Sequence, residues 1–80
     1  MEKVTTISWD ITLKKLSKTI DAFYKNNTDT MVIELHPRQV WNLMADMPVT
    51  SAQYHTFNCL MNGTFGEIWF EGAILRRKDD

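Results

Sequence analysis

The sequence predicts a small single domain of the α+β class, built from a three- to four-stranded, mainly antiparallel sheet with two or three helices packed on it. The length of 80 residues allows one domain with one hydrophobic core. Short β-branched and apolar runs, typical of strands, are interspersed with stretches in which apolar residues recur at helical spacing. This order of segments, without an internal repeat, is typical of an α+β domain. The domain is expected to span residues 1–80, with frayed ends at 1–2 and 78–80.

The first half of the chain predicts a strand, a helix and a second strand. Residues 3–8 are rich in β-branched side chains, which favour a strand. Asp10 is placed to cap a helix that runs to about residue 26. The apolar stripe of this helix consists of Leu13, Leu16, Ile20, Phe23 and Tyr24. A turn cluster then leads into residues 31–35, a short apolar run that is the strongest strand signal in the chain.

A second helix is predicted to begin at Pro37, which suits the first helical turn, and to end at Pro48. Its apolar stripe consists of Val40, Trp41, Met44 and Met47. Thr50 and Gln53 then have the spacing of a capping box, which predicts a third helix. This helix would end at Gly63, where a left-handed conformation stops it.

The third helix has a competing interpretation. Val49 can pack on Tyr54 as a hydrophobic staple at the start of the helix, which supports the helical reading. The Asn62–Gly63 pair is, however, the strongest short hairpin signal there is, and residues 55–61 would then form the first arm. Apolar and polar residues alternate poorly in that arm, so the pattern favours the helix.

The last part of the chain predicts either a hairpin or one long strand. Residues 67–71 alternate between a side that carries Trp69 and charged groups and a side made by Ile68 and Phe70. Gly72 either turns a tight hairpin into a further strand or marks a bulge. If Ile68 and Phe70 fill the core, Trp69 faces solvent between two glutamates.

Composition and charge argue against several function classes. A net charge of −1 and a pI near 6.1 do not provide the basic surface of a nucleic-acid or membrane-surface binder. No apolar run approaches the ~18–20 residues that span a bilayer, and the N-terminal segment lacks the layout of a secretory signal. With Cys59 as the single cysteine, no internal disulfide can form. A reducing, cytoplasmic location without membrane contact is therefore predicted.

The chain is predicted not to be an enzyme and to hold no cofactor or metal. Cys59 can be combined with His55 or His36 as nucleophile and base, but no nucleophile elbow or phosphate-binding glycine loop accompanies them. His55 and Cys59 lie four residues apart and would share a helical face. Two ligands are too few for a zinc site, and further ligands would have to come from His36 or Asp46.

The stretch MADMPVTSAQY, residues 44–54, resembles the central pattern of the helix-turn-helix family. The resemblance depends on the small Ala45 in the first helix, on the entry to the second helix at Val49 and Thr50, and on Tyr54 where that helix packs back. With the strands that follow, the order of elements resembles a winged helix. The resemblance implies a nucleic-acid-binding regulator that uses residues 37–62 and the strands of 64–78. Its contact residues would be Gln53, His55, Asn58, Arg76, Arg77 and Lys78.

The sequence departs from that pattern in three ways. Pro48 stands where the family has a glycine, and the spacing from Ala45 is one residue short, which would rotate the second helix by roughly 100°. Residues 51–62 contain no Lys or Arg, the residues that anchor phosphates and read guanine. Nucleic-acid binding is therefore the alternative, not the main prediction.

The bulky side chains predict binding to another protein. Three Trp, four Phe, two Tyr and five Met are many for so short a chain, and aromatic and Met side chains are enriched at protein interfaces. A small open sheet also has a free edge. We expect a non-enzymatic module that docks on a partner protein or pairs as a homodimer, and small regulators or inhibitors, including phage accessory proteins, are of this kind. The predicted contact residues are Trp41, Met44, Met47, Glu67, Trp69 and Glu71.

Overall fold

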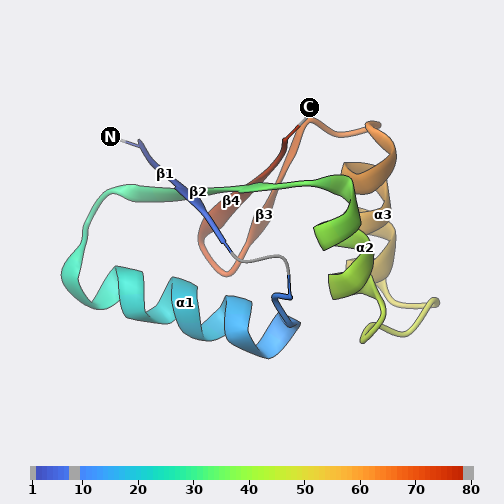
Figure 1. Cartoon of the computed structure of the whole chain (residues 1–80), viewed down its shortest axis with the longest axis horizontal. Coiled ribbons are helices and arrows are strands. Elements are labelled where there is room, and N and C mark those ends of the chain that lie inside the picture. The colour runs from blue at the N-terminus through green and yellow to red at the C-terminus, as the bar shows by residue number, and fades with distance from the viewer. Residues whose placement is uncertain (1, 8–9, 79–80) are drawn as a thin grey trace.

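A computed structural model describes residues 2–7 and 10–78 (Figure 1). The elements in chain order are β1 (Glu2–Thr6), α1 (Leu13–Asn26), β2 (Thr30–Leu35), α2 (Pro37–Met44), α3 (Ala52–Asn62), β3 (Glu67–Phe70) and β4 (Ala73–Arg77). Three helices and a four-stranded sheet in these residues confirm the predicted α+β class. The predicted fraying of residues 1 and 79–80 concerns residues outside the described ranges. The first strand, predicted over residues 3–8, runs from Glu2 to Thr6 and therefore ends two residues earlier.

The sheet has the strand order β1-β2-β4-β3. Strand β2 pairs in parallel with β1 and with β4, while β3 and β4 pair antiparallel. The prediction of a mainly antiparallel sheet is therefore wrong in this detail, because the sheet is mixed. The reason lies in the connections: each parallel pair is joined through helices, and parallel strands need such long crossovers, whereas only the β3–β4 turn is short enough for a hairpin.

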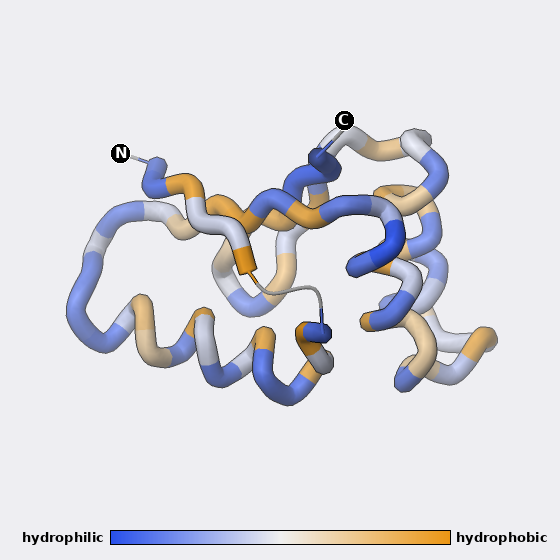
Figure 2. Tube along the Cα trace, viewed as in Figure 1, coloured by the Kyte–Doolittle hydropathy of each residue, from blue (hydrophilic) through white to orange (hydrophobic). Residues whose placement is uncertain are grey.

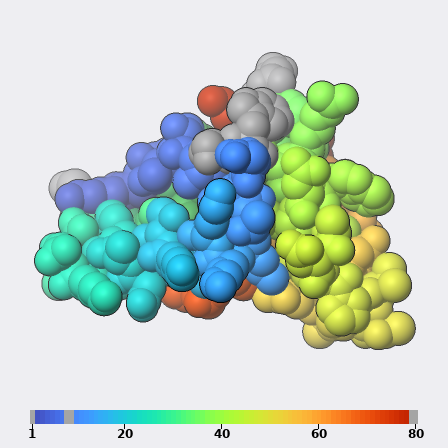
Figure 3. Space-filling view, turned by 60° about the horizontal axis from the view of Figure 1, so that its bottom comes forward, coloured from blue at the N-terminus to red at the C-terminus, as the bar shows by residue number. Residues whose placement is uncertain are grey.

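The fold has two layers, with the three helices on one face of the sheet (Figures 1 and 3). In Figure 2, the hydrophobic residues of α1 lie on the side toward the sheet and the hydrophilic residues lie on the opposite side. The core between the layers takes residues from the helices and from alternate positions of β2, β3 and β4. Its most buried members include Leu16, Ile20, Ile33, Leu35, Val40, Leu43, Met44, Phe57, Leu60 and Leu75.

Helix α1 begins later than predicted. Thr12 is the N-cap, and its hydroxyl accepts a hydrogen bond from the Lys15 amide at 3.2 Å. The prediction that Asp10 caps this helix is wrong, because Thr12 is the residue placed three positions before a free amide of the first turn. Of the predicted stripe, Leu16 and Ile20 are fully buried, and the other three members pack against the core.

Helix α2 begins at Pro37 as predicted, behind an N-cap that the sequence did not suggest. The His36 side chain accepts a hydrogen bond from the Arg38 amide, and the Gln39 side chain accepts one from the His36 amide at 2.9 Å. Gln39 also donates to the carbonyl of Ile7 at 3.1 Å. This buried amide therefore fastens the chain that follows β1 to the first turn of α2.

The corner between α2 and α3 corrects two predictions. The N-cap of α3 is Ser51, whose hydroxyl accepts from the Tyr54 amide at 3.1 Å, so the box built on Thr50 and Gln53 is absent. Val49 is 65% exposed and does not form the predicted staple. Residues 52–62 are helical, which confirms the helix over the hairpin arm, and Gly63 ends it at a φ of 87°.

A tight hairpin joins β3 to β4, which decides between the two interpretations of Gly72. Glu71 and Gly72 form its two-residue loop at φ angles of 50° and 86°, the positive values that a type I′ turn requires. Helix α1 holds this loop: Ser17 donates to the Glu71 carboxylate, and the Tyr24 hydroxyl donates to the Gly72 carbonyl at 2.7 Å. The same hydroxyl accepts from the amide of Met31 at 3.0 Å, so one side chain joins α1, β2 and the hairpin.

Candidate functional site

The side of the sheet opposite the helices, here called the open face, carries one apolar row across all four strands. The strand register aligns Val4 of β1 with Val32 of β2, Val32 with Ile74 of β4, and Ile74 with Trp69 of β3. Within the described residues, every helix lies on the other face. The four residues therefore form a continuous stripe that no described element covers.

Exposure along this apolar row is uneven. Trp69 and Val4, at the two edges of the sheet, are 67% and 54% exposed. Val32 and Ile74, on the two central strands, have exposures of 0% and 6%, although they do not belong to the core between the layers. The open face thus presents an apolar group at each edge and shields the centre of the row.

A polar row runs beside the apolar one and explains part of this shielding. The register aligns Thr6, Glu34, Arg76 and Glu67 on the same side of the sheet. The Arg76 guanidinium lies 3.3 Å from the Glu67 carboxylate and 3.6 Å from the carboxylate of Glu2. Because Glu2 belongs to β1 and Arg76 to β4, this second ion pair passes over β2, the strand that carries Val32.

The charge on the open face is unbalanced. Glu2 and Glu67 share Arg76, while the half-buried side chain of Glu34 makes no hydrogen bond or ion pair with any described residue. On the strands of this face three carboxylates therefore accompany one guanidinium, and Lys78, which follows Arg76 by two residues at the end of β4, adds one exposed cation. Lys3 does not add to the charge of this face. It is next to Val4 in β1, so its side chain points to the opposite side of the sheet, and it pairs with Asp29 at 3.6 Å.

The structure places the predicted contact residues of the last strands in two different settings. Trp69 points away from the core while Ile68 and Phe70 are buried, which confirms the predicted alternation. Glu67 lies beside Trp69 on the open face. Glu71 lies in the hairpin loop, bonded to Ser17, and so does not flank the indole as a strand residue would.

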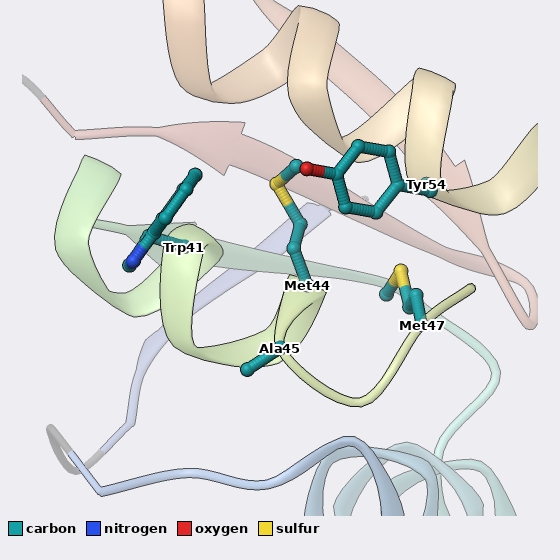
Figure 4. A pocket seen from close by; sticks show the side chains of 5 residues that line it. All are labelled: Trp41, Met44, Ala45, Met47 and Tyr54. Atoms are coloured by element: carbon teal, nitrogen blue, oxygen red, sulfur yellow. The ribbon is translucent and has the colours of Figure 1, made fainter. Parts of the chain in front are cut away.

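A second candidate surface is an apolar hollow of about 230 Å³ between α2 and α3 (Figure 4). Its lining residues are Trp41, Met44, Ala45, Met47 and Tyr54. Figure 4 shows Trp41 and Met44 extending from α2, Met47 from the turn after it, and Tyr54 from α3. The Trp41 indole is 57% exposed and forms a wall of the hollow.

Two predicted contact residues are buried in this region. Met44 and Met47 are only 2% and 7% exposed, because they pack in the core and contribute only part of their surface to the hollow. Trp41, in contrast, is not part of the buried stripe of α2. It follows Val40 by one residue, a rotation of about 100° that turns it outward, and Leu43 takes the place predicted for it.

The residues predicted for nucleic-acid binding do not form one surface. Gln53 and His55 are exposed on α3, and Asn58 is half-buried there. Arg76 lies on the open face between two carboxylates. Arg77 alternates to the helix side, where a Cβ added at Gly63 would lie 2.5 Å from its Nη1. Lys78 is exposed after β4, and its amide donates to the carbonyl of Leu35 at 2.8 Å.

The described residues contain no group of three or more His, Cys, Asp or Glu side chains that could hold a metal ion. Cys59 is a half-buried free thiol. Among the helices of residues 2–7 and 10–78, none is long and apolar enough to cross a membrane. Comparisons of the chain with protein-family models, curated proteins and solved structures found no match.

Sequence reasoning identified Trp69 and Glu67 as surface groups from the alternation of their strand, whereas it named Trp41 as a contact residue but assigned it to the apolar stripe of its helix. It missed the contribution of Val4, Val32 and Ile74, which become one row only when β1, β2 and β4 pair in the observed register. A strand pattern gives the face of each residue within its own strand but not the neighbour of that strand.

Proposed function

We propose that this chain is a non-enzymatic protein-binding module. The observation that carries the proposal is the exposure of two indoles, Trp41 at 57% and Trp69 at 67%, each beside further apolar side chains. Tryptophan is strongly enriched among the residues that contribute most to protein interfaces. Covering these two indoles with another polypeptide would remove apolar surface from water, which contributes favourable free energy to binding.

The role we assign to such a module is that of a small regulator or inhibitor. It acts by occupying a surface of its partner, which requires a rigid contact patch and no catalytic group. The partner is another protein or a second copy of this chain, and strands β1 and β3 leave the two edges of the sheet available for pairing.

The experiment compares single substitutions in a capture assay. The tagged protein is incubated with an extract of the cells that produce it, and the retained protein is identified and then reconstituted in pure form. We expect Trp69→Ala or Trp41→Ala to weaken the reconstituted complex by at least about 30-fold, the loss typical of a contact hot spot. Phe65→Ala is the matched control, since Phe65 is an aromatic residue 48% exposed outside both surfaces.

Two further measurements, of folding and of salt dependence, distinguish loss of binding from loss of the fold and protein binding from nucleic-acid binding. Circular dichroism and thermal unfolding must show that each variant keeps the fold. Affinity should change little between low and physiological salt, whereas a nucleic-acid complex would weaken steeply with salt and with charge reversal at Arg76 and Arg77. A complex that survives both tryptophan substitutions, or steep salt dependence with retained nucleic acid, would contradict the proposal.

A further inference from the structure

We infer that the open face receives a single amphipathic helix of a partner protein, in which an apolar stripe is flanked by lysine or arginine. This inference rests on the proposed function and names the class of partner that the open face fits. Its basis is the size of the face, the excess of carboxylates on it, and the ion pair by which Arg76 of β4 reaches Glu2 of β1 across β2, the strand that carries Val32.

The open face is too small for a globular partner. Four strands about 4.8 Å apart and five residues long at about 3.3 Å per residue give a face of roughly 19 by 17 Å, or about 300 Å². A stable interface between two folded proteins takes about 800 Å² from each partner. One helix is about 10–12 Å across and fits within this face. A second copy of the whole domain would contact only this small area, which is less than a stable interface between two folded proteins requires.

The net negative charge of the open face favours a partner helix with lysine or arginine on both sides of its apolar stripe. Glu2, Glu34 and Glu67 outnumber Arg76 and Lys78, and Glu34 lacks any partner in the described residues. Two copies of this face would bring six carboxylates together with four cationic side chains, Arg76 and Lys78 of each copy, so a cationic helix is a better electrostatic match than a second copy. A cationic helix supplies a partner for Glu34 and competes with Arg76 for the other two carboxylates.

The same competition opens the apolar row. Trp69 and Val4 are already exposed and provide the first contacts at the two edges. Arg76 reaches Glu2 across β2, so a lysine or arginine that takes Glu2 frees Arg76 to move away from Val32 and Ile74. Surface ion pairs such as these are individually weak, so the exchange is easily made. Apolar side chains of the helix then meet all four members of the row.

The test uses three synthetic peptides about 14 residues long, the length of helix that crosses this face. The first carries leucines on one helical face flanked by lysines, the second has glutamates in place of the lysines, and the third is a scramble of the first. Each is titrated into the isotope-labelled protein and followed by NMR. We expect only the first peptide to shift the Trp69 indole and the Val4, Val32 and Ile74 methyl signals.

A charge-matched pair of double variants isolates the role of the carboxylates. Glu34→Gln with Glu67→Gln should weaken binding of the lysine peptide at least tenfold. Asp21→Asn with Asp46→Asn changes the net charge by the same amount at exposed sites on α1 and in the turn after α2, and should leave the affinity unchanged. Equal losses in both double variants would show attraction to net charge alone and would overturn the inference.

The remaining outcomes separate the inference from the proposed function. Shifts confined to Trp41, Met47 and Tyr54, or equal binding of the glutamate peptide, would overturn the inference while leaving protein binding intact. The same holds if a reconstituted partner needs Trp69 but ignores Glu34→Gln with Glu67→Gln. A concentration-dependent dimer in light scattering that Trp69→Ala abolishes would assign the open face to a second copy instead.

Discussion

The two faces of the sheet are built by the same strands, yet they are covered in different ways. On one face, Ile33, Phe70 and Leu75 lie under a layer of three helices. On the other, Val32 and Ile74 are almost equally buried but have no described helix over them. Fractional burial alone therefore does not distinguish a core residue from one that lies under the side chains of its own face.

The difference shows how a small domain can keep an apolar surface without exposing all of it. A helical layer is fixed by many buried contacts, so uncovering the strands beneath it requires local or global unfolding. A side chain such as Arg76, held by two surface ion pairs, can move while the fold stays intact. By our inference, the open face is therefore the part of this molecule where burial is reversible, and substitutions of neighbouring residues on one strand test this.

The largest expected contrast is between Phe70 and Trp69 on β3. Phe70→Ala removes a ring that packs edge-on against Phe57, with centroids 5.6 Å apart, and should cost about 3–5 kcal/mol of unfolding free energy. Trp69→Ala should change it by no more than about 0.5 kcal/mol, because the indole is mostly in water. Urea unfolding of the two variants measures both values, and similar losses would show that the indole is part of a core.

A smaller contrast is expected between Leu75 and Ile74 on β4. Leu75→Ala leaves a cavity between the layers and should cost about 3 kcal/mol. Ile74→Ala should cost about 1–2 kcal/mol, since the side chains around it can close over the gap and water can enter. Urea denaturation measures both losses, and equal m-values would show that the two variants can be compared directly. A larger loss for Ile74→Ala than for Leu75→Ala would contradict the view that the open face is less tightly packed than the core.

The attachment of the helical layer to the hairpin can be tested at Tyr24. Tyr24→Phe removes the hydroxyl that bonds the Gly72 carbonyl and the Met31 amide, and should lower the unfolding free energy by about 1 kcal/mol. Hydrogen exchange should accelerate at the amide of Met31. Ser17→Ala is a matched comparison on the same helix, because it removes one exposed bond to the loop and should cost less.

The smallest expected effect on stability is at Arg76. Arg76→Gln breaks two surface ion pairs and should change the unfolding free energy by less than about 1 kcal/mol. It should nevertheless increase the binding of a hydrophobic dye such as ANS, because the centre of the apolar row loses its cover. Lys78→Gln is the control with the same charge change, and equal dye binding by both variants would rule out the covering role of Arg76.

Local properties of the chain are what sequence reasoning predicted well. The strand predicted at residues 31–35 and observed at Thr30–Leu35, the helix that begins at Pro37, the third helix with its end at Gly63 and the outward position of Trp69 all follow from periodicity and from the stereochemistry of Pro and Gly. Where several neighbouring residues could serve, as with Thr50 and Ser51 at the start of α3, the pattern did not distinguish the cap that forms.

By itself, then, the sequence predicted the α+β class, the first two strands and first two helices, and the side of its strand on which Trp69 lies, because these depend on residues close to one another in the chain; it favoured the third helix and left the hairpin at Gly72 open. Only the tertiary structure decided the parallel pairing of β2 with β1 and β4, and with it the row from Val4 to Trp69 and the reach of Arg76 to Glu2. Those contacts join residues on different strands that are distant in sequence. Their register is set by how the whole sheet packs under its helices, and no local pattern encodes it.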